Sequence, residues 1–241
     1  MIINVQIPKC ASMSTKYILT SHFGGSWSGV VGNTAEQAYN LYSNEIERRK
    51  KTKQNRPIKA ISGHMPFGIH KYIDEPCVYI MVSRHPIERV LSLWRFTYGR
   101  HSSHNLPLTD WLDVAGTKAH NVVTRYMGGE VVDHSWAGES SFFQQVPFVK
   151  IDEELSLLKA KSNVDKCHLI GVVERFEKFQ RELESYLGLK KKDIFHKNQF
   201  HYTPLEAKIE GYQPTNNEID KILKLNEMDL ELHNYISKVA P

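Results

Sequence analysis

The sequence predicts an α/β fold in which helices cover both faces of a central parallel sheet, giving three layers. Short apolar runs that are typical of strands are each followed by a segment with helical spacing. The run over residues 78–83 is continuously apolar, which indicates a parallel strand buried on both faces. With 241 residues, 41% hydrophobic and 24% charged, the chain suits one globular domain, and we expect it to span residues 1–241.

The first unit of this pattern predicts a strand over residues 2–7, a tight loop and a helix from Ser12 to about His22. Pro8 ends the apolar run, and hydroxyl residues at the start of the next segment are typical of a helix N-terminus. Residues 24–32 then hold glycine at four positions. This composition predicts a mobile loop that could act as a lid.

The remaining elements follow the same alternation. Further strands are predicted over residues 58–62, 78–83 and 168–173. The helices are predicted over residues 34–53, from Pro86 to about Tyr98, and over residues 118–127, 151–161, 175–187 and 217–239. Trp94 has helical spacing with Val90 and Leu91, which indicates a core position.

Composition excludes several classes of protein. The 31 Lys and Arg against 27 Asp and Glu leave a net charge of only +4, which favours a local anion site over a coat that binds nucleic acid. Three widely spaced cysteines, Cys10, Cys77 and Cys167, indicate neither a disulfide framework nor a metal site. No signal peptide or membrane-spanning run is visible, so we expect a cytoplasmic location without a membrane anchor.

The loop after the first strand, PKCASMSTK, lies where parallel sheets bind ligands. Lys9 supplies a positive charge, and Ala11 and Ser12 are small enough for the backbone to approach a ligand. The start of the helix would aim N–H groups at an anion, with hydroxyl donors from Ser12, Ser14 and Thr15. A phosphate or sulfate cradle fits, although a solvated lysine and an ordinary helix cap would also explain this loop. Because Lys9 opens the loop, the motif is not a Walker A sequence.

Two later loops carry further residues that could bind an anion or accept a proton. In SRHPIERVLSLW, Arg84 leaves a strand, and Arg89 lies one helical turn before Ser92, so a guanidinium and a hydroxyl could converge on a phosphate. An exposed arginine and a small packing serine would explain the segment equally well. In ISGHMPFGIH, His64 could act as a general base near neutral pH, and a part for His70 stays open.

Together these loops resemble the sulfotransferases that use 3′-phosphoadenosine 5′-phosphosulfate (PAPS), particularly the heparan sulfate 2-O and 6-O branch and its bacterial relatives. IPKCASMS is similar to the IPKTAGTS loop that holds the 5′-phosphosulfate, and VYIMVSRHPIERVLSLW to the 3′-phosphate motif. NVVTRYMGG and LIGVVERFEKF also look like family segments. The resemblance covers about residues 2–200. It implies a P-loop-like fold and transfer of a sulfuryl group, without a required metal, to an acceptor hydroxyl that we expect to be on a carbohydrate.

The resemblance also implies roles for individual residues. Lys9 would stabilise the leaving group, His64 would be the general base, and Arg84 with Ser92 would hold the 3′-phosphate. A segment near the C-terminus, HKNQFHYTPLEAK, would close over the nucleotide. The full set implied for cofactor binding is Lys9, Cys10, Ala11, Ser12, Met13, Ser14, Thr15, Arg84, Ser92 and Lys197. The sequence departs from the family at three positions, since Cys10 and Met13 replace threonines and His85 replaces an acidic residue.

Other interpretations remain at this stage. A nucleotide-dependent phosphotransferase would share the sheet, but GK[ST] is absent. A nucleic-acid-binding module could use the basic run over residues 48–59, which we interpret as a solvated helix tail and which could alternatively attract an anionic acceptor. Trp27 could stack on a sugar ring. Glu174 could orient Lys9 or the acceptor, or could form a salt bridge.

Overall fold

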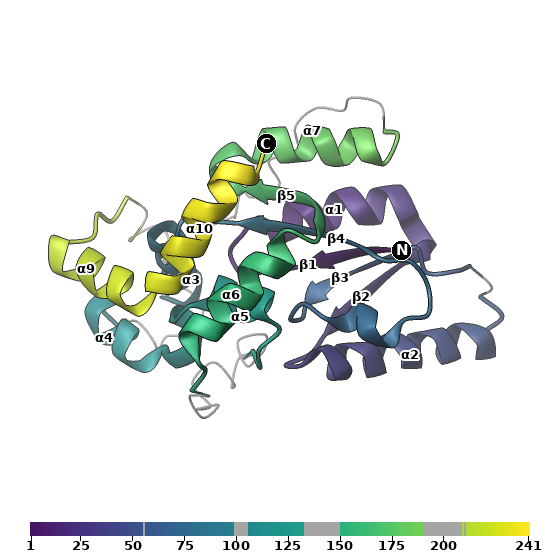
Figure 1. The fold of residues 1–241 in the computed structure, drawn as a ribbon, viewed down its shortest axis with the longest axis horizontal. Coiled ribbons are helices and arrows are strands. Elements are labelled where there is room, and N and C mark those ends of the chain that lie inside the picture. Colours follow the sequence, from purple (N-terminus) through teal and green to yellow (C-terminus); the bar gives the residue numbers. More distant parts are fainter. Residues whose placement is uncertain (55, 99–105, 133–149, 190–208, 210) are drawn as a thin grey trace.

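The computed structural model describes residues 1–54, 56–98, 106–132, 150–189, 209 and 211–241, so Lys197 lies outside the described residues. In the described part, five strands form one parallel sheet in the order β2-β3-β1-β4-β5 (Figure 1). The strands are β1 (Ile2–Val5), β2 (Trp27–Val31), β3 (Ala60–His64), β4 (Val78–Ser83) and β5 (Cys167–Val172). The predicted parallel α/β architecture is confirmed.

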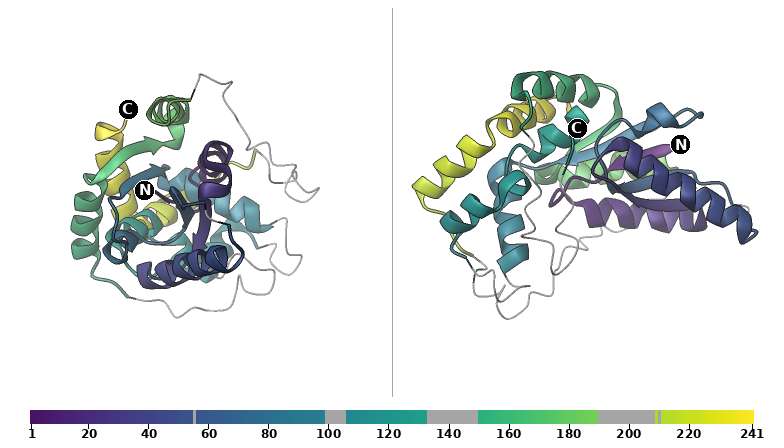
Figure 2. Two further views of the ribbon diagram at one scale, coloured as in Figure 1. Left: turned by 90° about the vertical axis from the view of Figure 1, so that its right-hand side faces the viewer. Right: turned by 90° about the horizontal axis from the view of Figure 1, so that it is seen from below.

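Helices cover both faces of this sheet, as Figure 2 shows for α1 and α7 against α2. One face packs against α1 (Ser12–Phe23) and α7 (Phe176–Tyr186), and the other against α2 (Ala35–Lys51), α5 (Val122–Gly128), α6 (Glu153–Val164) and α10 (Glu227–Val239). Neighbouring residues of β1 divide between these two cores, since Ile2 joins the first and Ile3 the second. A further core joins α3 (Pro86–Tyr98), α4 (Leu108–Val114) and α9 (Asn216–Leu225), and it buries Trp94 as predicted.

The prediction of a mobile loop over residues 24–32 is wrong. A short 3-10 turn over Gly24–Ser26 leads into β2, which pairs in parallel with β3 along its whole length. Gly29 suits this strand because a Cβ there would lie 2.9 Å from the ring of Trp27, which folds back over it. Trp27 packs beside the core of α1 and α7 rather than in a flexible loop.

Two predicted helices are interrupted, and each break is at an asparagine. The segment 118–127 divides into a 3-10 turn (Gly116–Ala119) and α5, with Asn121 in the left-handed region at φ 46°. The segment 217–239 divides at Asn226 into α9 and α10. The Asn226 amide donates to the carbonyls of Ala119 (2.7 Å) and Ile222 (2.9 Å), so tertiary contacts fix this break. The helix α4 was not predicted.

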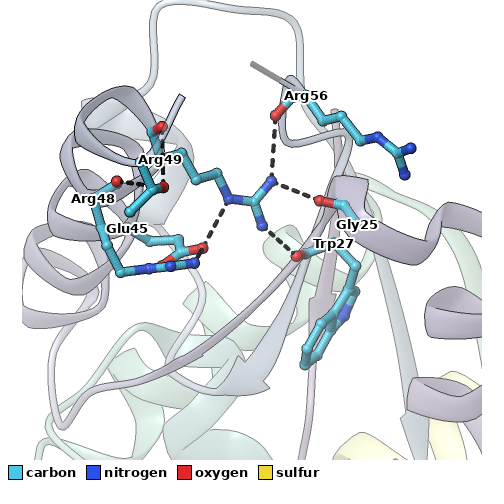
Figure 3. A network of polar contacts seen from close by, with 7 residues as sticks. Gly25, Trp27, Glu45, Arg48, Arg49 and Arg56 are labelled. Atoms are coloured by element: carbon cyan, nitrogen blue, oxygen red, sulfur yellow. Dashed lines mark hydrogen bonds and ion pairs between the residues drawn. The ribbon is translucent and has the colours of Figure 1, made fainter. Parts of the chain in front are cut away.

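The basic end of α2 lies at the amino ends of the strands. Arg49 there is only 9% exposed, and its guanidinium donates to the carbonyls of Gly25 (2.7 Å), Trp27 (2.8 Å) and Arg56 (3.3 Å) and to the Glu45 carboxylate (2.8 Å) (Figure 3). Arg49 therefore fastens α2 to the start of β2 instead of extending into solvent as predicted. Its neighbour Lys50 is solvated.

Among the described residues, no helix is both long and apolar enough to cross a membrane.

Candidate active site

The loops after β1 and β4 meet at the carboxyl edge of the sheet. The two strands are direct neighbours, with Val5 opposite Met81. From β1 the chain runs through α1 to β2 on one side of the sheet, whereas from β4 it continues to β5 on the other side. Ligands of parallel sheets bind where successive connections diverge in this way. Lys9 and Arg84, which follow these two strands, therefore lie at the expected ligand crevice.

Side chains of α3 contact both Lys9 and Arg84. The Arg84 guanidinium donates to the Lys9 carbonyl (3.4 Å) and to the Glu88 carboxylate (3.4 Å), while the Lys9 ammonium lies 4.2 Å from the centre of the Phe96 ring. Glu88, Ser92 and Phe96 follow one another at intervals of four residues, so they share one face of α3. Ser92 thus lies on the helix face that Lys9 and Arg84 contact at its two ends.

The loop before α1 has an unusual backbone. Lys9 and Ala11 have φ values of 66° and 53°, a left-handed conformation that costs of order 1 kcal/mol or more for residues other than glycine. The Ser12 hydroxyl donates to the Ile7 carbonyl (2.7 Å), which holds the turn closed. No side chain of the described residues caps α1, because Ala11 occupies the N-cap position. The first N–H groups of this helix can therefore serve an anion.

His64 ends β3 beside this loop. Its Nδ1 lies 2.7 Å from the carbonyl oxygen of Gln6, and since a carbonyl can only accept, Nδ1 carries the hydrogen in the neutral ring. The basic nitrogen is then Nε2. Two residues before His64 in β3, the Ser62 hydroxyl accepts hydrogen bonds from the amides of Asn4 (2.7 Å) and Gln6 (2.8 Å). This buried network fixes the end of β3 against β1 and thereby orients the imidazole.

This arrangement joins a basic loop at a helix N-terminus, a second basic strand end and a positioned histidine at one sheet edge. A model of the sulfotransferase family matches residues 1–236 of the chain. The chain belongs to the sulfotransferase family. No curated protein gave a match. Membership accounts for sulfuryl transfer as the general chemistry, and it agrees with the parallel sheet flanked by helices.

Other loop residues of this sulfotransferase differ in exposure. The Cys10 side chain is buried, which raises the pKa of its thiol to about 12, so the thiol stays protonated. Ser14 is also buried, and the Thr15 hydroxyl donates to the Ala11 carbonyl (3.3 Å). Met13 is 59% exposed and points its side chain into solvent. The side chains of Cys10 and Thr15 therefore support the sulfotransferase loop from inside.

Glu174 braces the second strand end of the sulfotransferase. Its carboxylate accepts the main-chain N–H of His85 (2.8 Å), just before α3 begins. A carboxylate at a helix N-terminus is stabilised by the helix dipole. Behind it, His85 and His233 lie with ring centres 5.4 Å apart, and burial lowers the pKa of His233. In the structure Glu174 thus contacts the start of α3 rather than Lys9.

Arg89, predicted near the Ser92 face, is fully buried. Its guanidinium donates to the Lys118 carbonyl (3.3 Å), and burial lowers its pKa. It supports α3 from behind. Phe96, whose ring lies beside Lys9, was not among the residues predicted for the site, although its spacing of four residues from Ser92 indicates the same helix face.

The segment NVVTRYMGG forms the buried helix α5, which supports the loop after His64. The Phe67 N–H donates to the Tyr126 carbonyl (2.8 Å). The N-terminus of α5 is held by Asp229, whose carboxylate accepts the N–H groups of Val123 (3.0 Å) and Thr124 (2.8 Å). Within the described ranges no group of three or more His, Cys, Asp or Glu is arranged to hold a metal ion.

Proposed function

We propose that this protein transfers the sulfuryl group of PAPS to a hydroxyl group of a carbohydrate acceptor. The observation that carries the proposal is the hydrogen bond from the Arg84 guanidinium to the Lys9 carbonyl, because it joins two basic residues that follow neighbouring strands. Family membership supports sulfuryl transfer, and the spacing of these residues supports PAPS as the donor.

The residues present suit a donor that carries two separate anionic groups. The backbone of the loop before α1, its uncapped first turn and Lys9 form one anion site. Arg84, which precedes α3, and Ser92, on the face of α3 that also carries Phe96, would form the second. When bound, PAPS supplies a sulfuryl group activated by its phosphate leaving group. A 5′-phosphosulfate at the first site and a 3′-phosphate at the second would match this division.

Lys9 would make the largest electrostatic contribution to stabilising the transition state. Its ammonium lies against the Phe96 ring, so part of its hydration is replaced by an aromatic surface that attracts cations. A charge in such a place stabilises negative charge that develops on the leaving group more strongly than a fully solvated lysine would. Arg84 and Ser92 would act in binding and orientation.

His64 would accept the proton of the acceptor hydroxyl at Nε2. The hydrogen bond from Nδ1 to the Gln6 carbonyl holds the tautomer that leaves Nε2 basic, and it stabilises the imidazolium that forms. The network through Ser62 keeps the ring in place. Lys197 stays a further prediction for the cofactor site.

The wider assignment is of a single domain over residues 1–241 that works in the cytoplasm without a nucleic-acid partner. The basic end of α2 does not suit acceptor binding, because it lies at the opposite edge of the sheet from Lys9 and Arg84 and uses Arg49 to fasten β2. We therefore assign acceptor contacts to the loops near His64.

Calorimetry with the product nucleotide, 3′-phosphoadenosine 5′-phosphate (PAP), tests the proposal. We expect saturable binding to the unaltered protein without Mg²⁺. Lys9→Ala should weaken PAPS binding and turnover, while Lys161→Ala is the matched control because Lys161 pairs with Glu231 on the surface. Absence of PAP binding, or Mg²⁺-dependent binding of ATP instead, would overturn the assignment in favour of a different donor.

A further inference from the structure

A cavity lies between α2 and α6, near the loop that follows His64. Its volume is about 710 Å³, and its walls come from residues 34–36, 67–68, 70–72, 128–129, 158–159, 162–163 and 166. Volumes of this size are typical of small-molecule sites. The connection after β2 lines the cavity and also bonds the end of β3, where the Gly32 N–H donates to the His64 carbonyl (3.0 Å). The cavity is formed by different loops from those that carry Lys9 and Arg84.

His70 lines this cavity, and a hydrogen bond with Tyr79 fixes its tautomer. The Tyr79 hydroxyl oxygen accepts the N–H groups of Gly68 (3.3 Å) and His70 (3.2 Å), and it lies 2.8 Å from Nδ1 of His70. Because two donors already occupy this oxygen, its own hydrogen goes to Nδ1. The neutral ring of His70 then carries its hydrogen on Nε2, the nitrogen on the opposite side of the ring from Tyr79. His70, a lining residue of the cavity, therefore has an N–H donor on the side of its ring away from Tyr79.

Cations dominate the charged groups around His70. Lys71 and Lys166 line the cavity. Burial lowers the pKa of His70, and the charges of these two lysines lower it further. Lys159 lines it as well and pairs with Glu130 (3.3 Å). Lys166 donates to the Asn163 amide oxygen (3.1 Å). Glu36, on the first turn of α2, is the carboxylate among the cavity-lining residues of the described chain. The site offers hydrogen-bond donors and positive charge.

We propose that this cavity binds an oxyanion, a sulfate or carboxylate group, through the Nε2 hydrogen of His70 and the ammonium groups of Lys71 and Lys166. Donors that converge in a positive field match an acceptor-only group. A bound anion offsets the two lysine charges, so it raises the pKa of His70. The proposal does not depend on PAPS chemistry, because none of its residues belongs to the loops of Lys9 and Arg84.

Sodium sulfate is the first probe, with the imidazole nitrogens of His70 followed by NMR. We expect a saturable shift of the Nε2 resonance and a raised pKa of His70 in the sulfate-bound protein. The double variant Lys71→Ala/Lys166→Ala removes two exposed charges and should weaken sulfate binding about tenfold or more. Lys161→Ala is the control, because Lys161 lies on α6 but pairs with Glu231 and does not line the cavity, so this variant should leave sulfate binding unchanged. An unsaturable response, or equal affinity in the double variant, would overturn the proposal.

A second set of measurements separates this site from the candidate active site and identifies the source of the anion. The variant Lys9→Ala/Arg84→Ala should keep the sulfate response of His70 even where PAP binding is lost. A sulfated disaccharide serves as the second ligand. If the lysine double variant weakens binding of the disaccharide as well as of sulfate, the anionic group belongs to a larger ligand. If the double variant weakens sulfate binding alone, the site binds a free anion. Either result supports the site, and a response to neither ligand contradicts it.

Discussion

The guanidinium of Arg84 donates a hydrogen bond to the main-chain carbonyl of Lys9 over 3.4 Å, and this contact joins the residues that follow two neighbouring strands. The backbone of Lys9 is in a left-handed conformation, which glycine adopts without the steric cost that a side chain brings. Arg84 thus helps to hold the loop of Lys9, and we expect this loop and Arg84 to bind the same ligand. A change at one strand end is therefore expected to affect the other.

Arg84→Lys tests whether the planar guanidinium is needed. We expect PAP affinity to fall about 10- to 100-fold, because lysine keeps the charge but cannot contact the Lys9 carbonyl and a phosphate together. Arg181→Ala is the control, since Arg181 pairs only weakly with Glu177 on the surface. Calorimetry with PAP provides the measurement. Unchanged affinity in Arg84→Lys would show that a simple positive charge is sufficient.

His64→Ala should separate turnover from cofactor binding. We expect the rate of sulfuryl transfer to fall about 10²- to 10⁴-fold, the usual contribution of a general base, with PAP affinity within about twofold of the original. His22→Ala, at the far end of α1, should change neither quantity. Transfer assays with labelled PAPS and an acceptor panel, beside calorimetry, give both values. A large loss of PAP affinity in the His64 variant would contradict its role as the base.

Arg49→Ala should destabilise the protein without changing the crevice. The substitution leaves the carbonyls of Gly25 and Trp27 without their donor, and we expect a loss of about 1–3 kcal/mol in the free energy of unfolding. Lys50→Ala, whose side chain is 68% exposed, should change stability by no more than about 0.5 kcal/mol. Urea unfolding measures both variants. Weakened PAP binding in the folded Arg49→Ala variant would argue against a purely structural role for Arg49.

Stability should decrease in mild acid because of His233. Burial lowers the pKa of this group in the folded protein, so between its folded and unfolded pKa values the unfolded chain binds more protons. Its contribution to stability is fully present above the unfolded value, near pH 6.5, and is lost as the pH falls through the folded value. The slope it adds is at most about 1.4 kcal/mol per pH unit. Urea unfolding between pH 7 and pH 5 should show a flatter dependence in His233→Gln, and an unchanged slope would exclude His233 as the source.

Gly63→Ala should prevent normal pairing of β2 with β3. A Cβ at Gly63 would lie 1.6 Å from the Val30 carbonyl oxygen, so the main chain of β2 or of β3 would have to move. We expect a loss of about 3 kcal/mol or more in the free energy of unfolding, or no folded protein. Gly25→Ala is the matched control, because among the described residues its new Cβ would meet the flexible side chain of Arg56 at 3.4 Å. Equal melting temperatures for the two variants would contradict this packing.

Much of the frame around the site follows from local sequence. The strand β4 and the helix α3 lie where they were predicted, because a continuous apolar run identifies a strand buried on both faces and Pro86 suits the first turn of a helix. The prediction for β3 ended two residues early, at Ser62, whereas the strand continues through His64. That error concerns a boundary, where local propensity is weak and pairing with neighbouring strands decides.

Only the tertiary structure decided several other features. Glycine-rich β2 forms because β3 supplies its hydrogen-bond partners, and the helix break at Asn226 forms because distant carbonyls accept its amide. Sequence alone determined which chemical groups follow each strand, including Lys9 and Arg84. Their meeting depended on the strand order, which places β1 beside β4, and on the Phe96 ring against Lys9. Contacts between residues far apart in the chain are set by packing of whole elements, and local patterns do not carry that information.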